Sequence, residues 1–225
     1  MQVDLPAAIG ELRRSILTMG ASVEHRVNQA INSLIHRDSD TACAVRFGDA
    51  EIDRMEISIE ETCLRLLALN HPVAGDLRFI LAVMRINTEL ERVADLAKSI
   101  AKRALDLVQL KPVDAPPVLV RMAEETRYMF ANAMIAFADR DTALARSIRE
   151  HDTIVDDLQR EMFVWVQSEI PRHVESLSAA IDLLSVARKL ERIADISTNI
   201  AENVIFLAEG AMVRHGHQEK AKPKN

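Results

Sequence analysis

Residues 90–101 read LERVADLAKSIA, and the segment returns 100 positions later as LERIADISTNIA at residues 190–201. Seven of the twelve positions are identical, which indicates an internal duplication. Around each copy, apolar residues recur at alternating intervals of three and four, the spacing that places them on one side of an α-helix. We call this side the apolar seam. It comprises Val83, Ile86, Leu90, Val93, Ala97, Ile100, Ala104 and Leu107 in the first copy and Leu183, Val186, Leu190, Ile193, Ser197, Ile200, Val204 and Leu207 in the second.

The duplication extends upstream of these segments at an offset of 103, where Arg37, Asp38, Ala42, Arg46, Asp49 and Asp53 match Arg140, Asp141, Ala145, Arg149, Asp152 and Asp156. Between short breaks, each half accommodates three helices, at residues 7–37, 41–69 and 75–109 and at residues 115–139, 142–169 and 173–209. Short connections favour antiparallel neighbours. The sequence therefore predicts an all-α fold of two tandem up-down three-helix bundles, in domains 1–112 and 113–210, followed by a solvated tail at 211–225.

The composition is that of a folded, acidic protein. Of the 225 residues, 48% are apolar and 28% are charged, which excludes an intrinsically disordered chain. The net charge is −6 and no basic stripe is present, so we expect no nucleic-acid partner. Two cysteines, no leader-like start and no apolar run long enough to cross a bilayer predict a cytoplasmic protein without a membrane span.

Four pairs of carboxylate residues stand out because each pair has i, i+4 spacing. On a helix both members share one face, and like charges so placed cost about a few tenths of a kcal/mol per pair. The pairs occupy equivalent positions in the two halves and lie beside the apolar seam. They are Asp49 with Asp53, Glu91 with Asp95, Asp152 with Asp156, and Glu191 with Asp195.

Antiparallel packing places two of these pairs at one height in each bundle. In the first half, the pair on the second helix and the pair on the third helix both lie about 30 Å from the turn near residue 73, at a rise of about 1.5 Å per residue. The second half repeats this arrangement around its turn near residue 172. Each half can therefore gather four carboxylates in one surface patch, which three glutamates of the first helices can extend: Glu24, Glu124 and Glu125.

Four oxygen ligands without a balancing cluster of cations favour a bound hard or borderline metal, and iron, manganese and magnesium suit these ligands. Two alternatives stay open. The same residues can form a solvated acidic face, balanced by surface arginines, on a helical scaffold without metal. A carboxylate-bridged di-metal enzyme is disfavoured, because such sites use Glu-x-x-His motifs that project into the bundle and the sequence contains none. No other catalytic motif is present, so we expect a protein that is not an enzyme.

The repeated segment resembles the twin LERxGD signatures of the PhoU family of phosphate-transport accessory proteins. These signatures correspond to residues 90–95 and 190–195, and the stretches LTMG at 17–20 and RDSD at 37–40 are also similar to that family. The resemblance covers about residues 11–210. Ala94 and Ala194 stand where the family often has glycine, a departure that leaves the carboxylates unchanged.

This resemblance implies E(D)xxxD motifs that bind iron or zinc at the surface, carried here by Asp49, Asp53, Glu91, Asp95, Asp152, Asp156, Glu191 and Asp195. It also implies a regulator that acts between the phosphate ABC transporter, through its ATPase subunit, and a membrane sensor histidine kinase. Such a regulator represses the phosphate-starvation response and limits phosphate uptake. We expect a free-standing cytoplasmic dimer that reaches the membrane only through these partners.

Overall fold

The computed structural model describes residues 4–48, 50–110, 113–169 and 176–210 of the chain. Within these ranges the regular structure is entirely α-helical, as the sequence predicts. The helices are α1 (Leu5–Ile35), α2 (Ser39–Phe47), α3 (Ala50–Asn70), α4 (Ala74–Val108), α5 (Pro117–Asp139), α6 (Thr142–Glu169) and α7 (Leu177–Glu209). None of these helices is long and apolar enough to cross a membrane.

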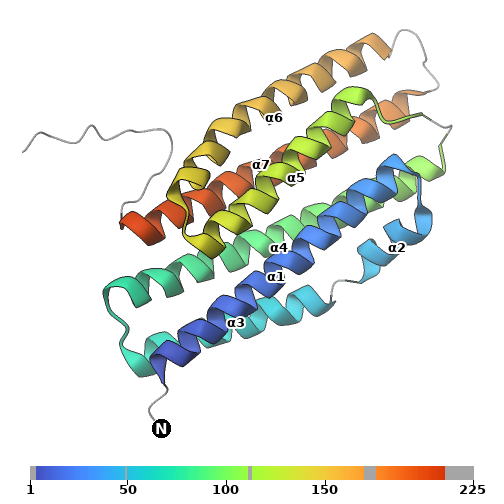
Figure 1. Cartoon of the computed structure of the whole chain (residues 1–225). Helices are drawn as coiled ribbons and strands as arrows, with labels where there is room; N and C mark the ends of the chain where they lie inside the picture. Colours follow the sequence, from blue (N-terminus) through green and yellow to red (C-terminus); the bar gives the residue numbers. More distant parts are fainter. Residues whose placement is uncertain (1–3, 49, 111–112, 170–175, 211–225) are drawn as a thin grey trace, which may run out of the picture.

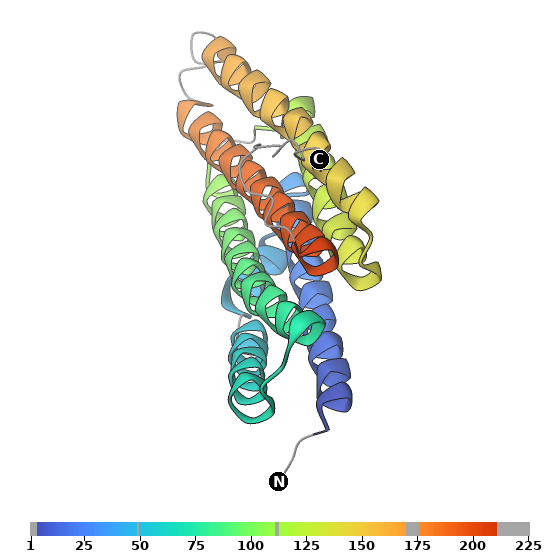
Figure 2. The same ribbon diagram turned by 90° about the vertical axis from the view of Figure 1, so that its left-hand side faces the viewer.

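The helices form two bundles that lie against each other along their length (Figure 1). In the first bundle α1 packs on α4, while α2 and α3 follow one another and both contact α1 and α4. In the second bundle α5, α6 and α7 pack pairwise. The bundles meet where α4 contacts α7 and α1 contacts α5, and Figure 2 shows α4 and α7 side by side from a second direction. The predicted pair of three-helix bundles is confirmed, with α2 and α3 together in the place of one helix.

The prediction of one continuous helix over residues 41–69 is wrong, because the helix is interrupted at Gly48, between α2 and α3. The amide of Gly48 donates to the carbonyl oxygen of Ala44 at 3.0 Å, and a Cβ on residue 48 would lie only 2.6 Å from that oxygen. Arg26 of α1 donates to the carbonyl oxygen of Gly48 at 2.5 Å. This tertiary hydrogen bond satisfies a carbonyl that has no partner within the helix, because it lies at the helix end. At the equivalent position the second half has His151, and α6 is continuous there.

An Arg-Asp pair precedes the second helix in both halves. Arg37 and Arg140 both adopt the left-handed backbone conformation, with φ angles of 54° and 56°. The aspartate that follows caps the next helix, because the Oδ1 atoms of Asp38 and Asp141 accept hydrogen bonds from the amides two and three residues further on, at 2.9 to 3.0 Å. The same turn therefore recurs at an offset of 103, as a duplication requires.

The ends of several helices differ from the sequence prediction by a few residues. The left-handed Arg37 ends the first helix early, at Ile35. The fifth helix begins at Pro117 rather than at 115, because Pro116 is extended, with φ of −65° and ψ of 150°. The predicted start of the last helix at 173, the domain limit at 112 and the tail at 211–225 lie outside the described residues, so the predicted domain limits remain predictions.

The apolar seams of α4 and α7 form the centre of the core. Every residue of both seams is buried. The one polar member, Ser197, donates its hydroxyl hydrogen to the carbonyl oxygen of Ile193 at 2.8 Å, so it is buried without an unsatisfied donor. Full burial of a large aliphatic side chain stabilises the fold by about 1.5–3 kcal/mol, so these two helices supply much of its cohesion.

We expect Leu90→Ala to lower the free energy of unfolding by about 3 kcal/mol, because a fully buried leucine leaves a cavity when it is truncated. Leu64→Ala is the matched control, since 52% of that side chain is exposed, and its effect should stay within about 0.5 kcal/mol. Urea unfolding followed by circular dichroism measures both. Equal losses in the two variants would contradict the central role of the seam.

Candidate functional site

A first acidic patch lies where α3 meets α4, and it consists of Asp53, Glu56, Glu91 and Asp95. Burial raises the pKa of Glu91, and repulsion by Asp95 and a hydrogen bond with Asp95 raise it further, followed by repulsion from Glu56 and Asp53. Burial likewise raises the pKa of Glu56, with repulsion from Glu60, Asp53 and Asp95 adding to it. The two helices thus bring three of the predicted carboxylates into one electrostatic cluster.

The membership of this first acidic patch differs from the sequence prediction in one way. The predicted membership of Asp49 stays a prediction, because Asp49 lies outside the described residues. Glu56 belongs to the cluster and was not predicted, although it stands three residues after Asp53 and so shares its helix face. That spacing could have identified it. The second half has Gln159 at the equivalent position.

Positive charges partly neutralise the first acidic patch. Lys98 Nζ lies 3.3 Å from Oδ1 of Asp95, one turn earlier on α4. Burial lowers the pKa of Arg26 on α1, and electrostatic attraction to Asp53 opposes this lowering. Arg26 also reaches Lys98, because its charge adds to burial in lowering the pKa of the lysine. A cation that enters this patch therefore meets two resident positive charges.

A second acidic patch lies between α6 and α7 and consists of Asp152, Asp156, Glu191 and Asp195. Burial, followed by repulsion from Asp195, Asp156 and Glu191, raises the pKa of Asp152 to about 6. Burial and repulsion within the same group also raise the pKa of Glu191 and of Asp195, against the attraction of Arg192. All four carboxylates that the sequence singles out in this half therefore interact with one another.

The second acidic patch has different positive groups beside it. The residue equivalent to Lys98 is Thr198, whose hydroxyl donates to the carbonyl oxygen of Asp195 on its own helix at 2.7 Å. Arg192 opposes the rise in the pKa of Glu191 and of Asp195, and His151 opposes the rise in the pKa of Asp152. The two halves thus share a scaffold but differ in the charge that surrounds the carboxylates.

A histidine is held beside the second acidic patch by α5. His151 Nε2 lies 2.7 Å from Oε2 of Glu125, and its ring packs on Tyr128 with 4.8 Å between ring centres. Glu125 is one of the three glutamates expected to extend the patches. Its partner His151 directly precedes Asp152 in the chain, so Glu125 lies beside the second acidic patch. Glu124 faces Arg127 instead, where it opposes the lowering of the arginine's pKa by burial.

The carboxylates lie close enough to repel one another, but they do not form a complete metal coordination shell. Within residues 4–48, 50–110, 113–169 and 176–210, no three His, Cys, Asp or Glu side chains stand in an arrangement that could hold a metal ion as they are. Both patches offer only oxygen donors from the carboxylates. Such donors suit iron, manganese and magnesium, whereas structural zinc sites usually include nitrogen or sulfur.

These observations define a class of protein: a tandem repeat of helical bundles, each with an acidic patch between its last two helices. Comparison with known proteins specifies the class further. The family model described as PhoU domain matches the chain twice, at residues 16–104 and 119–204. The chain belongs to the PhoU family, which confirms the resemblance seen in the repeated motif.

Two relatives are named phosphate-specific transport system accessory protein PhoU homolog. The protein from Zymomonas mobilis subsp. mobilis is 38% identical over 90% of this chain and 85% of its own length. The protein from Pseudomonas putida is also 38% identical, over 93% of this chain and 82% of its own length. Relatives with this name are called accessory proteins rather than enzymes, in keeping with the expectation from the sequence.

Solved structures have the same fold. PhoU from Pseudomonas aeruginosa matches with a TM-score of 0.87 at 34% identity, over 92% of this chain and 100% of that chain. The phosphate transport system regulatory protein PhoU from Streptococcus pneumoniae matches with a TM-score of 0.85 at 30% identity, over 93% of this chain and 99% of that chain. The tandem-bundle architecture is therefore that of the family.

The raised pKa of Asp152 makes stability depend on pH. Its carboxyl binds a proton more readily in the folded state, at a pKa of about 6, than at its ordinary value of 3.8, so metal-free protein loses stability as pH rises between these values. We expect Asp152→Asn to raise the melting temperature by about 2–4 °C at pH 7.5, the effect of roughly 1 kcal/mol in a protein of this size, and by much less at pH 4.

Asp157→Asn is the control for this measurement, because Asp157 is exposed and pairs with Arg160 on the surface of α6. Its melting temperature should match that of the wild type at both pH values. Differential scanning calorimetry in the presence of a chelator gives the comparison. A fall in the melting temperature of the Asp152 variant at pH 7.5 would contradict the cost that burial and repulsion impose on the charged form of this residue.

Proposed function

We propose that the chain is a metal-binding regulator that couples a phosphate transporter to a signalling partner and represses the phosphate-starvation response. The observation that carries this proposal is the second acidic patch, where four carboxylates repel one another on the flank of a bundle. The names of the relatives, accessory protein of the phosphate-specific transport system, support association with that transporter.

In the second bundle, Asp152, Asp156, Glu191 and Asp195 would hold the metal. A divalent or trivalent cation there would offset the repulsion that raises the pKa of Asp152. Iron or zinc follows from the family resemblance, and manganese or magnesium from the oxygen donors. The expected metal site in the first bundle uses Asp49, Asp53, Glu91 and Asp95, and Glu56 is an additional donor there.

The position of the patches suits a role in recognition. Asp53, Asp95 and Asp195 are exposed on the flanks, so a bound metal would change the charge that a partner meets. Charge complementarity governs the rate and the specificity of association. We infer that the partners are the ATPase subunit of the phosphate ABC transporter and the cytoplasmic part of a membrane sensor histidine kinase. The regulator would act as a dimer in the cytoplasm and reach the membrane through them.

A helical scaffold without metal is the alternative function. Surface arginines and lysines would then balance the acidic flanks, as Lys98 does at Asp95. A carboxylate-bridged di-metal enzyme has less support, because the carboxylates lie outside the buried seam and not in the interior of a bundle. Metal content distinguishes the scaffold from the regulator.

Metal analysis of untagged protein tests the first part of the proposal. The double substitution Asp152→Asn with Asp156→Asn should abolish the site in the second bundle and leave that in the first, whereas Glu91→Gln with Asp95→Asn should do the reverse. Elemental analysis gives the stoichiometry, and calorimetric titration with iron, zinc, manganese and magnesium identifies the preferred ion. Asp157→Asn is the control. Unchanged stoichiometry in both double variants would refute the metal assignment.

A reporter of phosphate-starvation genes tests the regulatory part. In phosphate-rich cells, removal of the four carboxylates of the second acidic patch should derepress the reporter while the amount of soluble protein stays normal, because flank residues contribute little to packing. Leu90→Ala should also derepress, but through loss of folded protein. Full repression by the carboxylate variant at normal abundance would exclude this patch as the regulatory surface.

A further inference from the structure

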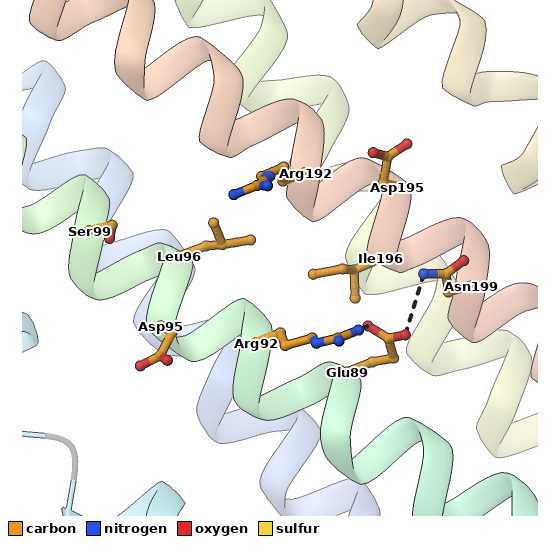
Figure 3. A pocket seen from close by; sticks show the side chains of 9 residues that line it. All are labelled: Glu89, Arg92, Asp95, Leu96, Ser99, Arg192, Asp195, Ile196 and Asn199. Atoms are coloured by element: carbon orange, nitrogen blue, oxygen red, sulfur yellow. Dashed lines mark hydrogen bonds and ion pairs between the residues drawn. The ribbon is translucent and has the colours of Figure 1, made fainter.

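A groove of about 450 Å³ runs between α4 and α7, where the two bundles meet (Figure 3). The arginine of each LER motif lines it: Arg92 extends along α4 towards Glu89, and Arg192 extends from α7 towards Leu96 and Ser99 (Figure 3). The groove is therefore built from the duplicated motif, and Asp95 and Asp195 of the two acidic patches stand at its borders.

The duplication makes the two sides of this groove equivalent, but their charges differ. Three residues before Arg92 stands Glu89, whose Oε2 lies 3.4 Å from Nη1 of the arginine. Asn199 of α7 donates to the other oxygen of Glu89 at 3.3 Å. Three residues before Arg192 stands Lys189. One end of the groove thus holds a neutral ion pair, and the other holds two cations.

The cationic end, which we call the basic end, widens into a pocket of about 660 Å³ between α4, α6 and α7. Arg188, Lys189 and Arg192 line it. Neutral hydrogen-bonding groups stand among them, from Ser99, Gln159 and Ser185. Lys189 Nζ already donates to Oγ of Ser185 at 2.8 Å, so part of the donor set is held in place.

The positive charges of the basic end lie close together, because Arg188, Lys189 and Arg192 fall within about one turn of α7 and line the same pocket. The guanidinium of Arg188 is fixed over the ring of Phe163, with 5.4 Å between its central carbon and the ring centre. An anion placed among these groups would relieve the repulsion.

Two acidic residues offset part of this charge. Asp182 forms an ion pair with Arg103 at 3.0 Å. Glu191 lines the pocket and attracts Arg192. Three cations against the one carboxylate in the lining still leave the pocket with an excess of positive charge.

We propose that the basic end of the α4–α7 groove binds the phosphate group of a small anionic ligand, with Lys189 and Arg192 as its charged donors. Phosphate offers several acceptor oxygens and up to two negative charges, which match the cations of α7 and the hydroxyl groups of Ser99 and Ser185 in the pocket. The volume suits a ligand between inorganic phosphate and a mononucleotide. For a nucleotide, Phe163 and Arg188 provide a flat surface beside the phosphate site.

Calorimetric titration of the full chain with inorganic phosphate or ADP, in the presence of a chelator, tests this site. Lys189→Glu copies the Glu-Arg pair of the first half, so the fold should tolerate it, and it should weaken binding by at least about tenfold. Arg192→Gln should have a similar effect. Arg92→Gln removes the equivalent arginine at the neutral end and is the matched control, with affinity expected within about twofold of the wild type. Thermal melting checks that each variant is folded.

The two probes separate the sources of the phosphate group. Binding of phosphate, with loss in the Lys189 and Arg192 variants only, supports a site for the free ion. Binding of ADP alone, with the same dependence on variants, supports a phosphorylated nucleotide. The proposal is overturned if neither probe binds, or if Arg92→Gln weakens binding as much as Arg192→Gln. Loss of binding in Asp156→Asn would also overturn it, because the anion would then depend on the second acidic patch. Failure of this site leaves the metal measurements unaffected.

Discussion

The burial of the apolar seams on α4 and α7 is the constraint on which the rest of the structure depends. Each of these helices packs against the other helices of its own bundle and against its counterpart in the other bundle. Once Leu90 and Leu190 point into the core, the two residues that follow each of them have fixed directions. Glu91 then lies on the flank beside α3, and Glu191 lies on the flank beside α6. The arginines that follow them lie in the groove between the bundles.

Much of this arrangement could be predicted from the sequence, because the helix period and the duplication are local patterns. The grouping of Asp152 and Asp156 with Glu191 and Asp195 follows from periodicity and antiparallel packing alone. The break at Gly48 could not be predicted in this way, since it involves a hydrogen bond from a residue 22 positions earlier. The groove also escaped prediction. Its lining depends on the contact between bundles, about which a pattern within one repeat carries no information.

The two halves share a scaffold but carry different charges at equivalent positions. Lys98 beside the first acidic patch corresponds to Thr198 beside the second, and Glu89 in the groove corresponds to Lys189. Neither difference touches the buried seam, so the bundles stay equivalent in packing while their surfaces differ in charge. The side chains that the core requires and the side chains that distinguish the halves are separate sets on the same two helices.

The break at Gly48 has a consequence for motion. Separated from α2, the 21-residue α3 buries Ile52, Ile59, Cys63 and Leu66, whereas the longer α4 buries fourteen residues. Because so few of its residues are buried, we expect α3 to open locally at a lower free energy than the central helices. A cation bridging α3 and α4 would act as a staple on that helix. Amide hydrogen exchange in α3 would slow on binding, while the central pair stayed unchanged.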